Sequence, residues 1–128
     1  MTIRKSAEDY LEAMLMLHQQ HGYIRSIDIS RQLNVTKPSV SYAVKQLREN
    51  GYISLDENNF ILLTDAGREI AERIYERHKL LTELFIRLGV NPETAREDAC
   101  KVEHDLSEET FAAIRLHAKE KGSEGYPL

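Results

Sequence analysis

One segment in the second half of the chain carries three side chains that bind transition metals. Cys100, Glu103 and His104 supply a thiol, a carboxylate and an imidazole at the spacing i, i+3 and i+4. In a helix this spacing places all three on one face, about a turn apart. These three groups together make half of a coordination shell for a transition metal. The segment therefore predicts one half of a metal site.

Two carboxylates near the N-terminus supply the other half. Asp9 and Glu12 are also spaced i, i+3, and His78 in the middle of the chain is a further candidate ligand. Each residue alone has an ordinary interpretation, as a solvated charge, a surface imidazole or a small buried thiol. Their joint occurrence favours metal binding over those interpretations.

The elements between the two halves have the order of a winged helix-turn-helix. Apolar spacing predicts helices over 6–21, 26–33 and 36–50, the last of them capped by a threonine and ended by a glycine. Two short apolar runs follow, over 52–55 and 60–63, with a polar turn between them that indicates a β-hairpin. Helix, turn, helix and hairpin in this order predict a DNA-binding head.

Polar side chains lie on the third helix and at the tip of the hairpin, where such a head contacts DNA. Hydroxyls, amines and amides on a recognition helix can reach phosphate oxygens and base edges. Any exposed helix can carry such residues, and Asn is also the usual turn residue, so only the topology favours the DNA interpretation. The predicted DNA contacts are Arg25, Thr36, Lys37, Pro38, Ser39, Ser41, Tyr42, Lys45, Gln46, Asn58 and Asn59.

The net charge of −4 lies entirely in the second half of the chain. Residues 1–64 carry 7 basic and 7 acidic side chains, whereas residues 25–50 carry 5 basic and 2 acidic ones. Phosphate binding depends on this local field rather than on the total charge. An acidic protein with a basic recognition helix is therefore compatible with a double-stranded DNA partner.

The second half of the chain is predicted to be helical throughout. Helices are expected from residue 65 to about 88, from 91 through the Cys-Glu-His segment, and from 107 to about 121. Three helices exceed what a DNA head requires, so they are expected to form a dimerisation layer and a sensor. The predicted fold is mainly α, with a winged helix-turn-helix domain over 1–64 and a helical dimerisation and metal-binding domain over 65–128.

Other functional classes find little support in the 128 residues. No apolar run approaches membrane-spanning length and the N-terminus lacks a signal core, so we expect a cytoplasmic protein without a membrane partner. The single cysteine excludes an intrachain disulfide and agrees with a reducing compartment. The sequence has no zinc-protease helix motif, no Gly-rich phosphate loop and no nucleophile elbow. We therefore predict no catalytic residues and no enzymatic activity.

Five stretches of the chain carry a resemblance to a known family. The most specific is Asp98 to Ser107, and the others are Glu8–Glu12, Val35–Ser41, Leu63–Gly67 and Arg77–Leu81. In these stretches the chain resembles the diphtheria toxin repressor family of metal-dependent bacterial regulators, and the resemblance covers nearly the whole sequence. The resemblance implies the short, two-domain, manganese-responsive branch, which lacks the third domain of the iron-responsive branch. It also implies a homodimer that binds operator DNA and represses metal-uptake genes when metal is plentiful.

Carried over position by position, the resemblance implies a mixed ligand set. Asp9 and Glu12 match the carboxylates of the manganese branch, and the ligands at His78, Glu103 and His104 are common to both branches. The implied metal ligands are Asp9, Glu12, His78, Cys100, Glu103 and His104.

Cys100 departs from the manganese branch, which has a bridging Glu at this position, and matches the iron branch. Thr82 and Arg96 stand where the iron branch has the Glu and His of its second metal site, so that site is incomplete. Carboxylates suit Mn(II), whereas a thiolate shifts preference toward Fe(II), Co(II), Zn(II) or Cd(II). Mn(II) and Fe(II) are the leading candidates for the physiological ion.

Three alternative functions remain open from the sequence. A winged-helix regulator gated by a small organic ligand would bind its operator equally well with and without a chelator. A metallohydrolase using Glu103 and His104 would turn over an ester or amide and would not bind DNA. A DNA-architectural protein would bind almost independently of metal and of base sequence.

Overall fold

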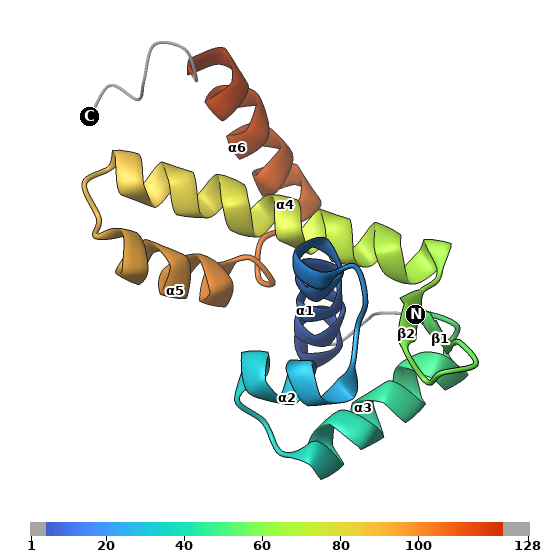
Figure 1. The fold of residues 1–128 in the computed structure, drawn as a ribbon. Helices are drawn as coiled ribbons and strands as arrows, with labels where there is room; N and C mark the ends of the chain where they lie inside the picture. The colour runs from blue at the N-terminus through green and yellow to red at the C-terminus, as the bar shows by residue number, and fades with distance from the viewer. Residues whose placement is uncertain (1–4, 122–128) are drawn as a thin grey trace. The chain divides into compact units, whose positions relative to one another are not determined.

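Six helices and one two-stranded sheet make up residues 5–121, the part of the chain that a computed structural model describes, with side chains described through residue 118. The elements follow in the order α1, α2, α3, β1, β2, α4, α5 and α6 (Figure 1). They form two compact units that divide between Arg73 and Ile74, within α4. The predicted mainly helical fold with an N-terminal winged helix-turn-helix is confirmed.

The first unit begins with three helices, α1 (Lys5–His21), α2 (Ser26–Leu33) and α3 (Lys37–Glu49), of which the last two form the helix-turn-helix. The turn between α2 and α3 begins at Asn34, which adopts the left-handed conformation at φ 55° and ends α2. Thr36 then caps α3, because its hydroxyl accepts a hydrogen bond from the backbone N–H of Ser39. Both ends of the helix-turn-helix are therefore set by local side chains.

The wing follows directly from the end of α3. Gly51 adopts φ 82°, a conformation that side chains disfavour, and reverses the chain into β1 (Ile53–Leu55). This strand pairs antiparallel with β2 (Ile61–Leu63), and Ile53 stands opposite Leu63. The N–H of Ile61 also donates to the carbonyl of Ile24, 2.9 Å away. The wing is thereby joined to the segment between α1 and α2.

Apolar side chains from every element of the first unit are buried together. Helices α1, α2 and α3 pack against one another, α3 packs against β1, and α1 packs against β2. The buried apolar side chains include Leu11, Met14, Ile24, Ile29, Val40, Leu47, Ile53 and Ile61. Burial of this set fixes the orientation of α3 within the unit.

Helix α4 (Asp65–Arg87) begins the second half of the chain and continues into the second unit, which also contains α5 (Pro92–Val102) and α6 (Glu108–Lys121). Asn91 caps α5 by accepting a hydrogen bond from the N–H of Glu93. Ser107 caps α6 in the same way through the N–H of Thr110. These are the starts that the sequence predicts for both helices.

The predicted extent of the fifth helix is wrong by two residues. Helix α5 ends at Val102, and His104 lies in the turn that leads to α6. Glu103 still has helical dihedral angles, and its N–H donates to the carbonyl of Ala99 at 2.9 Å. The helical phase from Cys100 to Glu103 is therefore preserved, whereas His104 reaches its position through the turn.

None of the helices in residues 5–121 has the length and apolar character needed to cross a membrane.

Candidate metal centre and nucleic-acid interface

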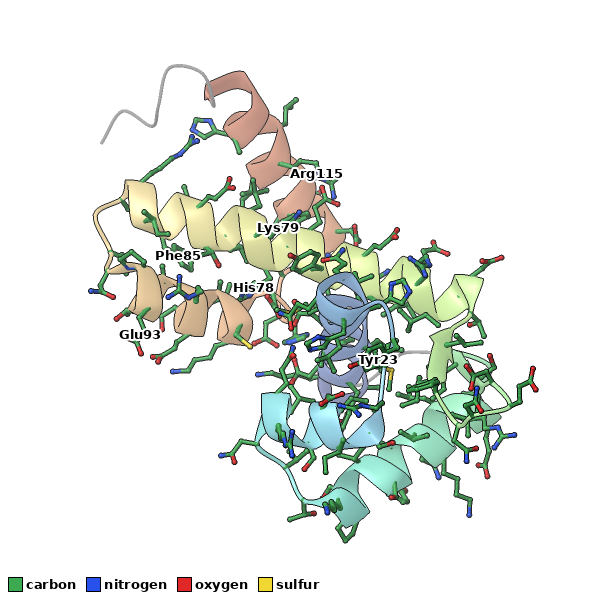
Figure 2. The ribbon with its side chains drawn as sticks, in the orientation of Figure 1. Tyr23, His78, Lys79, Phe85, Glu93 and Arg115 are labelled. Atoms are coloured by element: carbon green, nitrogen blue, oxygen red, sulfur yellow. The ribbon has the colours of Figure 1, made fainter. Side chains whose placement is uncertain are left out.

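A fully buried carboxylate is the centre of the second unit's candidate site. The side chain of Glu103 is 0 % exposed, and both of its oxygens face imidazoles. Oε2 lies 3.0 Å from Nδ1 of His78 on α4, and Oε1 lies 3.4 Å from Nε2 of His104. Figure 2 shows His78 directed from α4 toward the end of α5. His78 thus meets the Glu103 carboxylate although the two residues are 25 positions apart in sequence.

This arrangement fits a divalent transition metal. Burying a carboxylate is costly unless hydrogen bonds or charges compensate it. The Glu103 oxygens and the imidazole nitrogens of His78 and His104 are the donor types that Mn(II), Fe(II) and Zn(II) bind. Their separations of 3.0 and 3.4 Å keep three potential donor groups within one small volume. The chemistry of the donor set is therefore compatible with the predicted ion.

Cys100 lies one helical turn before Glu103 on α5 and is exposed. Its thiol takes part in no disulfide. Exposure distinguishes it from the buried, inert cysteines that behave as small apolar residues. The position leaves the thiol accessible to a metal or to solvent.

The two predicted ligands near the N-terminus belong to the first unit. Asp9 and Glu12 lie one turn apart on α1, where Asp9 is half-buried and Glu12 is 7 % exposed. They follow Glu8, which is also buried and whose carboxylate lies 3.7 Å from the guanidinium of Arg73. Three carboxylates within two turns of a helix that also buries apolar residues are unusual for a purely structural helix.

The structure thus brings three of the six predicted ligands into contact within the second unit. A fourth lies one turn away on α5, and the remaining two lie together on α1 of the first unit.

Arg77 is a buried polar residue that the sequence interpretation missed. It is only 4 % exposed, and Lys and Arg are rarely buried without partners. Its spacing carries a signal, because Ile74 and Leu81 lie at i−3 and i+4 and are both buried. An arginine in the apolar stripe of a helix predicts a structural or functional role for its guanidinium.

The third helix exposes most of its predicted DNA contacts. Lys37, Ser39, Ser41 and Lys45 are exposed, and Tyr42 is 67 % exposed, the highest value among the large apolar side chains of the described residues. A groove beside this helix is lined by Ser26, Ser41, Val44, Lys45, Arg48, Glu49 and Leu55. Hydroxyls and cations in such a groove suit phosphate oxygens.

The other predicted DNA contacts on α3 and at the tip of the wing differ in their surroundings, and some already form hydrogen bonds within the protein. The Thr36 hydroxyl caps α3 and lies 2.8 Å from the Ser39 hydroxyl. Gln46 is only half-buried, and Pro38 is exposed in the first turn of α3. At the tip of the wing, the N–H of Asn58 donates to the Asp56 side chain. Asn59, also at the tip, adopts φ 64°.

Arg25 forms an ion pair at the start of α2. Its Nε lies 2.9 Å from Oδ2 of Asp28, and its guanidinium stacks over the ring of Tyr23 at 5.2 Å. The hydrogen bond from Arg25 lowers the pKa of the Asp28 carboxyl, despite an opposing contribution from desolvation. The Arg25 charge is thus shared with Asp28 rather than fully available to DNA.

Two family models together match most of the chain. Residues 2–59 match the iron dependent repressor N-terminal DNA binding domain. Residues 64–120 match the iron dependent repressor metal binding and dimerisation domain.

Individual regulators are also similar to this chain over most of its length. Transcriptional regulator MntR of Escherichia coli O6:H1 is 35 % identical over 120 residues, which cover 94 % of this chain and 77 % of that protein. The crystal structure of T. acidophilum IdeR superimposes with a TM-score of 0.78 at 29 % identity. The superposition covers 99 % of this chain and 58 % of the IdeR chain.

A third similarity is to a manganese-dependent transcriptional repressor in complex with manganese. Its TM-score is 0.75 at 25 % identity, and the match covers 87 % of this chain and 51 % of the other. This chain thus spans slightly more than half of each of the two solved structures. The resemblance inferred from the sequence is confirmed: the chain belongs to the iron-dependent repressor family of metal-dependent, DNA-binding transcriptional regulators, which are not enzymes.

Proposed function

We propose that this chain is a cytoplasmic, homodimeric repressor of metal-uptake genes that binds its operator when Mn(II) or Fe(II) is bound. The buried Glu103 carboxylate between two imidazoles is the single observation that carries the proposal. It lies inside the segment that matches a metal binding and dimerisation domain.

The proposed ligand set combines both halves of the chain. The metal would be held by carboxylates from α1 together with the thiol, carboxylate and imidazoles of the second unit. When bound, it would supply a divalent charge that attracts the carboxylates and would couple the two groups of ligands. The proposed ligands are Asp9, Glu12, His78, Cys100, Glu103 and His104.

The proposed division of labour follows the chain order. Residues 1–64 bind DNA through α3 and the wing, and residues 65–128 dimerise and bind metal. In a dimer, two recognition helices dock together only when their separation matches the spacing of the operator half-sites. A metal held by ligands of both segments would favour the matching separation. A coupling of roughly 1–3 kcal/mol would change operator affinity about 5–150-fold.

The proposed DNA contacts remain those predicted from the sequence. Exposure of Lys37, Ser41, Tyr42 and Lys45 supports them, because base edges and phosphates are reached by side chains that extend from the helix surface. Asn58 and Asn59 would contact the DNA backbone from the wing. Arg25 would contribute only in part, because Asp28 shares its charge.

The proposed ion is Mn(II) or Fe(II). Similarity to a structure described as a manganese-dependent repressor with manganese favours Mn(II). The thiol of Cys100 favours softer ions, including Fe(II), Zn(II), Co(II) and Cd(II). Raw affinity favours tight binders such as Zn(II), so the geometry of the site and the cellular availability of each metal must decide which ion acts in vivo.

The experiment that tests the proposal is operator binding across a panel of divalent ions. A duplex selected from a random library by the manganese-loaded protein serves as the operator fragment. We expect fluorescence anisotropy to show binding that Mn(II) or Fe(II) strengthens and a chelator reverses. The Asp9→Ala and His104→Ala variants should lose this metal response. Glu97→Ala, which removes an exposed carboxylate of α5, should retain it.

Three results would overturn the proposal. Operator affinity that is unchanged by metal and chelator favours gating by an organic ligand. Metal-independent binding that is almost blind to sequence favours an architectural role. Retention of the full metal response by both ligand variants rejects the proposed ligands.

A further inference from the structure

Arg77 is a buried cation beside a proposed ligand, and the metal chemistry itself does not require it. The residue is 4 % exposed and directly precedes His78 on α4. Its guanidinium packs over the ring of Phe111 on α6, with its central carbon 5.0 Å from the ring centroid. Burying a guanidinium is costly unless its N–H groups find acceptors, and here Nη1 and Nη2 find them whereas the buried Nε has no hydrogen-bond partner among the described residues.

The acceptors of Arg77 lie on the turn between α5 and α6 and at the first residue of α6. Nη1 donates to the backbone carbonyl of Glu103 at 3.0 Å and to that of Leu106 at 2.8 Å. Nη2 donates to Oε1 of Glu108 at 2.7 Å. The last carbonyls of a helix have no partners within that helix, so an external donor must satisfy them. The Arg77 side chain therefore hydrogen-bonds to the turn at Glu103 and Leu106 and to the first residue of α6.

Residue 103 is consequently held at both of its polar ends by consecutive residues of α4. Arg77 binds its backbone carbonyl, and His78 lies 3.0 Å from its carboxylate. This double contact fixes where the Glu103 carboxylate lies and where the following turn carries His104. A rigid fork with two donor nitrogens can do this, whereas a single ammonium cannot reach all three acceptors in the same way.

The positive charge of Arg77 would by itself weaken metal binding, whereas its positioning of Glu103 would strengthen it. A cation close to a divalent metal repels it, so an electrostatic role would weaken metal binding. The ion pair with Glu108 offsets part of that charge. Any contribution of Arg77 to tighter metal binding must therefore come from geometry.

We infer that Arg77 is a positioning residue for the metal centre, which orients Glu103 and His104 by holding the turn between α5 and α6. The inference rests on the proposed function, because it requires that these residues bind metal. Groups that hold metal ligands in place typically change metal affinity 10–100-fold when removed.

The test compares Arg77→Met and Arg77→Lys with the control Arg115→Met. Arg115 also stacks over Phe111, at 4.9 Å, and pairs with Glu76, but among the described residues it forms no hydrogen bond or ion pair with the turn. Mn(II) affinity is measured by competition with a chromogenic chelator. The visible spectrum of the Co(II)-saturated protein reports coordination geometry, which a mere loss of stability would leave unchanged.

We expect Arg77→Met to weaken Mn(II) binding by about 10–100-fold and to alter the saturated Co(II) spectrum. Arg77→Lys should lose less, and Arg115→Met should match the wild type. If Arg77→Met does not fold, Arg77→Lys decides, and a wild-type affinity and spectrum would overturn the inference. Equal or tighter binding by Arg77→Met would overturn it too. A wild-type protein that binds no Mn(II) would instead reject the proposed function.

Discussion

The first unit exposes its candidate DNA contacts, whereas the second unit buries the carboxylate of its candidate metal site. Tyr42 on α3 is 67 % exposed and Lys45 is exposed as well, while Glu103 is 0 % exposed and meets two imidazoles. A surface that binds a long polyanion works through many weak contacts spread over a helix and a wing. A metal site works through a few strong contacts in a small volume.

This difference predicts how each unit responds to substitution. Loss of one contact among many changes DNA affinity by a modest factor, whereas loss of one ligand removes much of the metal affinity. The structure thus predicts graded effects in the first unit and near-complete effects at the second unit's carboxylate.

The largest effect is expected from Glu103→Gln. The substitution preserves shape but removes the charge on the carboxylate between His78 and His104. We expect Mn(II) affinity to fall by more than roughly 100-fold. Even the loss of a group that only hydrogen-bonds to a metal ligand typically lowers metal affinity about 10–100-fold. Metal-stimulated operator binding should disappear with it. Isothermal titration with Mn(II) measures the first effect and anisotropy the second. Retention of wild-type affinity would contradict the comparison between the two units.

The next largest effect is a loss of stability in the first unit, caused by Gly67→Ala. In Gly67→Ala the new Cβ would lie 2.0 Å from the carbonyl oxygen of Tyr52, which also accepts a hydrogen bond from Thr64. Backbone must shift to admit it, so we expect a loss of about 1–3 kcal/mol in the free energy of unfolding.

Urea unfolding measures this loss. Glu69→Ala, at an exposed position on the same helix, is the control and should stay within about 0.5 kcal/mol of the wild type. Equal stabilities of Gly67→Ala and the control would show that the wing and α4 are not closely packed.

Local signals predicted most of the fold. Thr36, Asn91 and Ser107 are capping residues, and each directly precedes a helix in the structure. Gly51 ends the third helix as expected and turns the chain into the wing. Such caps act over three or four residues, so they can be recognised without knowledge of the tertiary fold.

The contacts within the candidate site could be predicted only in part. Spacing suggested that Cys100 and Glu103 share a helix face, but it cannot show that His78 meets Glu103 from another helix. The end of α5 at Val102 was missed for a related reason, because Arg77 satisfies the carbonyl of Glu103 from 26 residues away. Long-range partners decide such details, and local periodicity does not report them.

Cys100→Glu sharpens the comparison by changing the ligand chemistry of the second unit alone. Replacing the exposed thiol with a carboxylate should favour Mn(II) over Zn(II), because carboxylates suit the harder ion. We expect the ratio of the two affinities to move by about tenfold, or ~1.4 kcal/mol. Competition titrations measure it. Cys100→Ser removes the thiolate without adding a charge and separates the two causes. An unchanged Mn(II)/Zn(II) ratio would exclude the thiol from the site.

A smaller, graded effect is expected from Lys45→Ala on α3. If Lys45 contacts one phosphate, its removal lowers operator affinity about equally for all sequences and reduces the salt slope by about 1. Anisotropy titrations at several salt concentrations measure the slope. Lys79→Ala removes an exposed charge from the second unit and should leave the slope unchanged. Identical slopes for the two variants would move the phosphate contacts away from this part of α3.

The smallest effect concerns the Arg25–Asp28 pair, a more exposed counterpart to the buried carboxylate of the second unit. Because Arg25 lowers the pKa of Asp28 in the folded protein, the pair stabilises the fold above the ordinary Asp value of 3.8. This contribution is lost as the pH falls through the lowered pKa. In Arg25→Gln the Asp28 pKa should rise, and the stability difference from the wild type should vanish at low pH. NMR titration of the carboxyl carbon measures the pKa. Arg31→Gln should shift it less, since Arg31 contributes only a weaker charge effect. Equal shifts in both variants would show that long-range charge, rather than the hydrogen bond from Arg25, sets the Asp28 pKa.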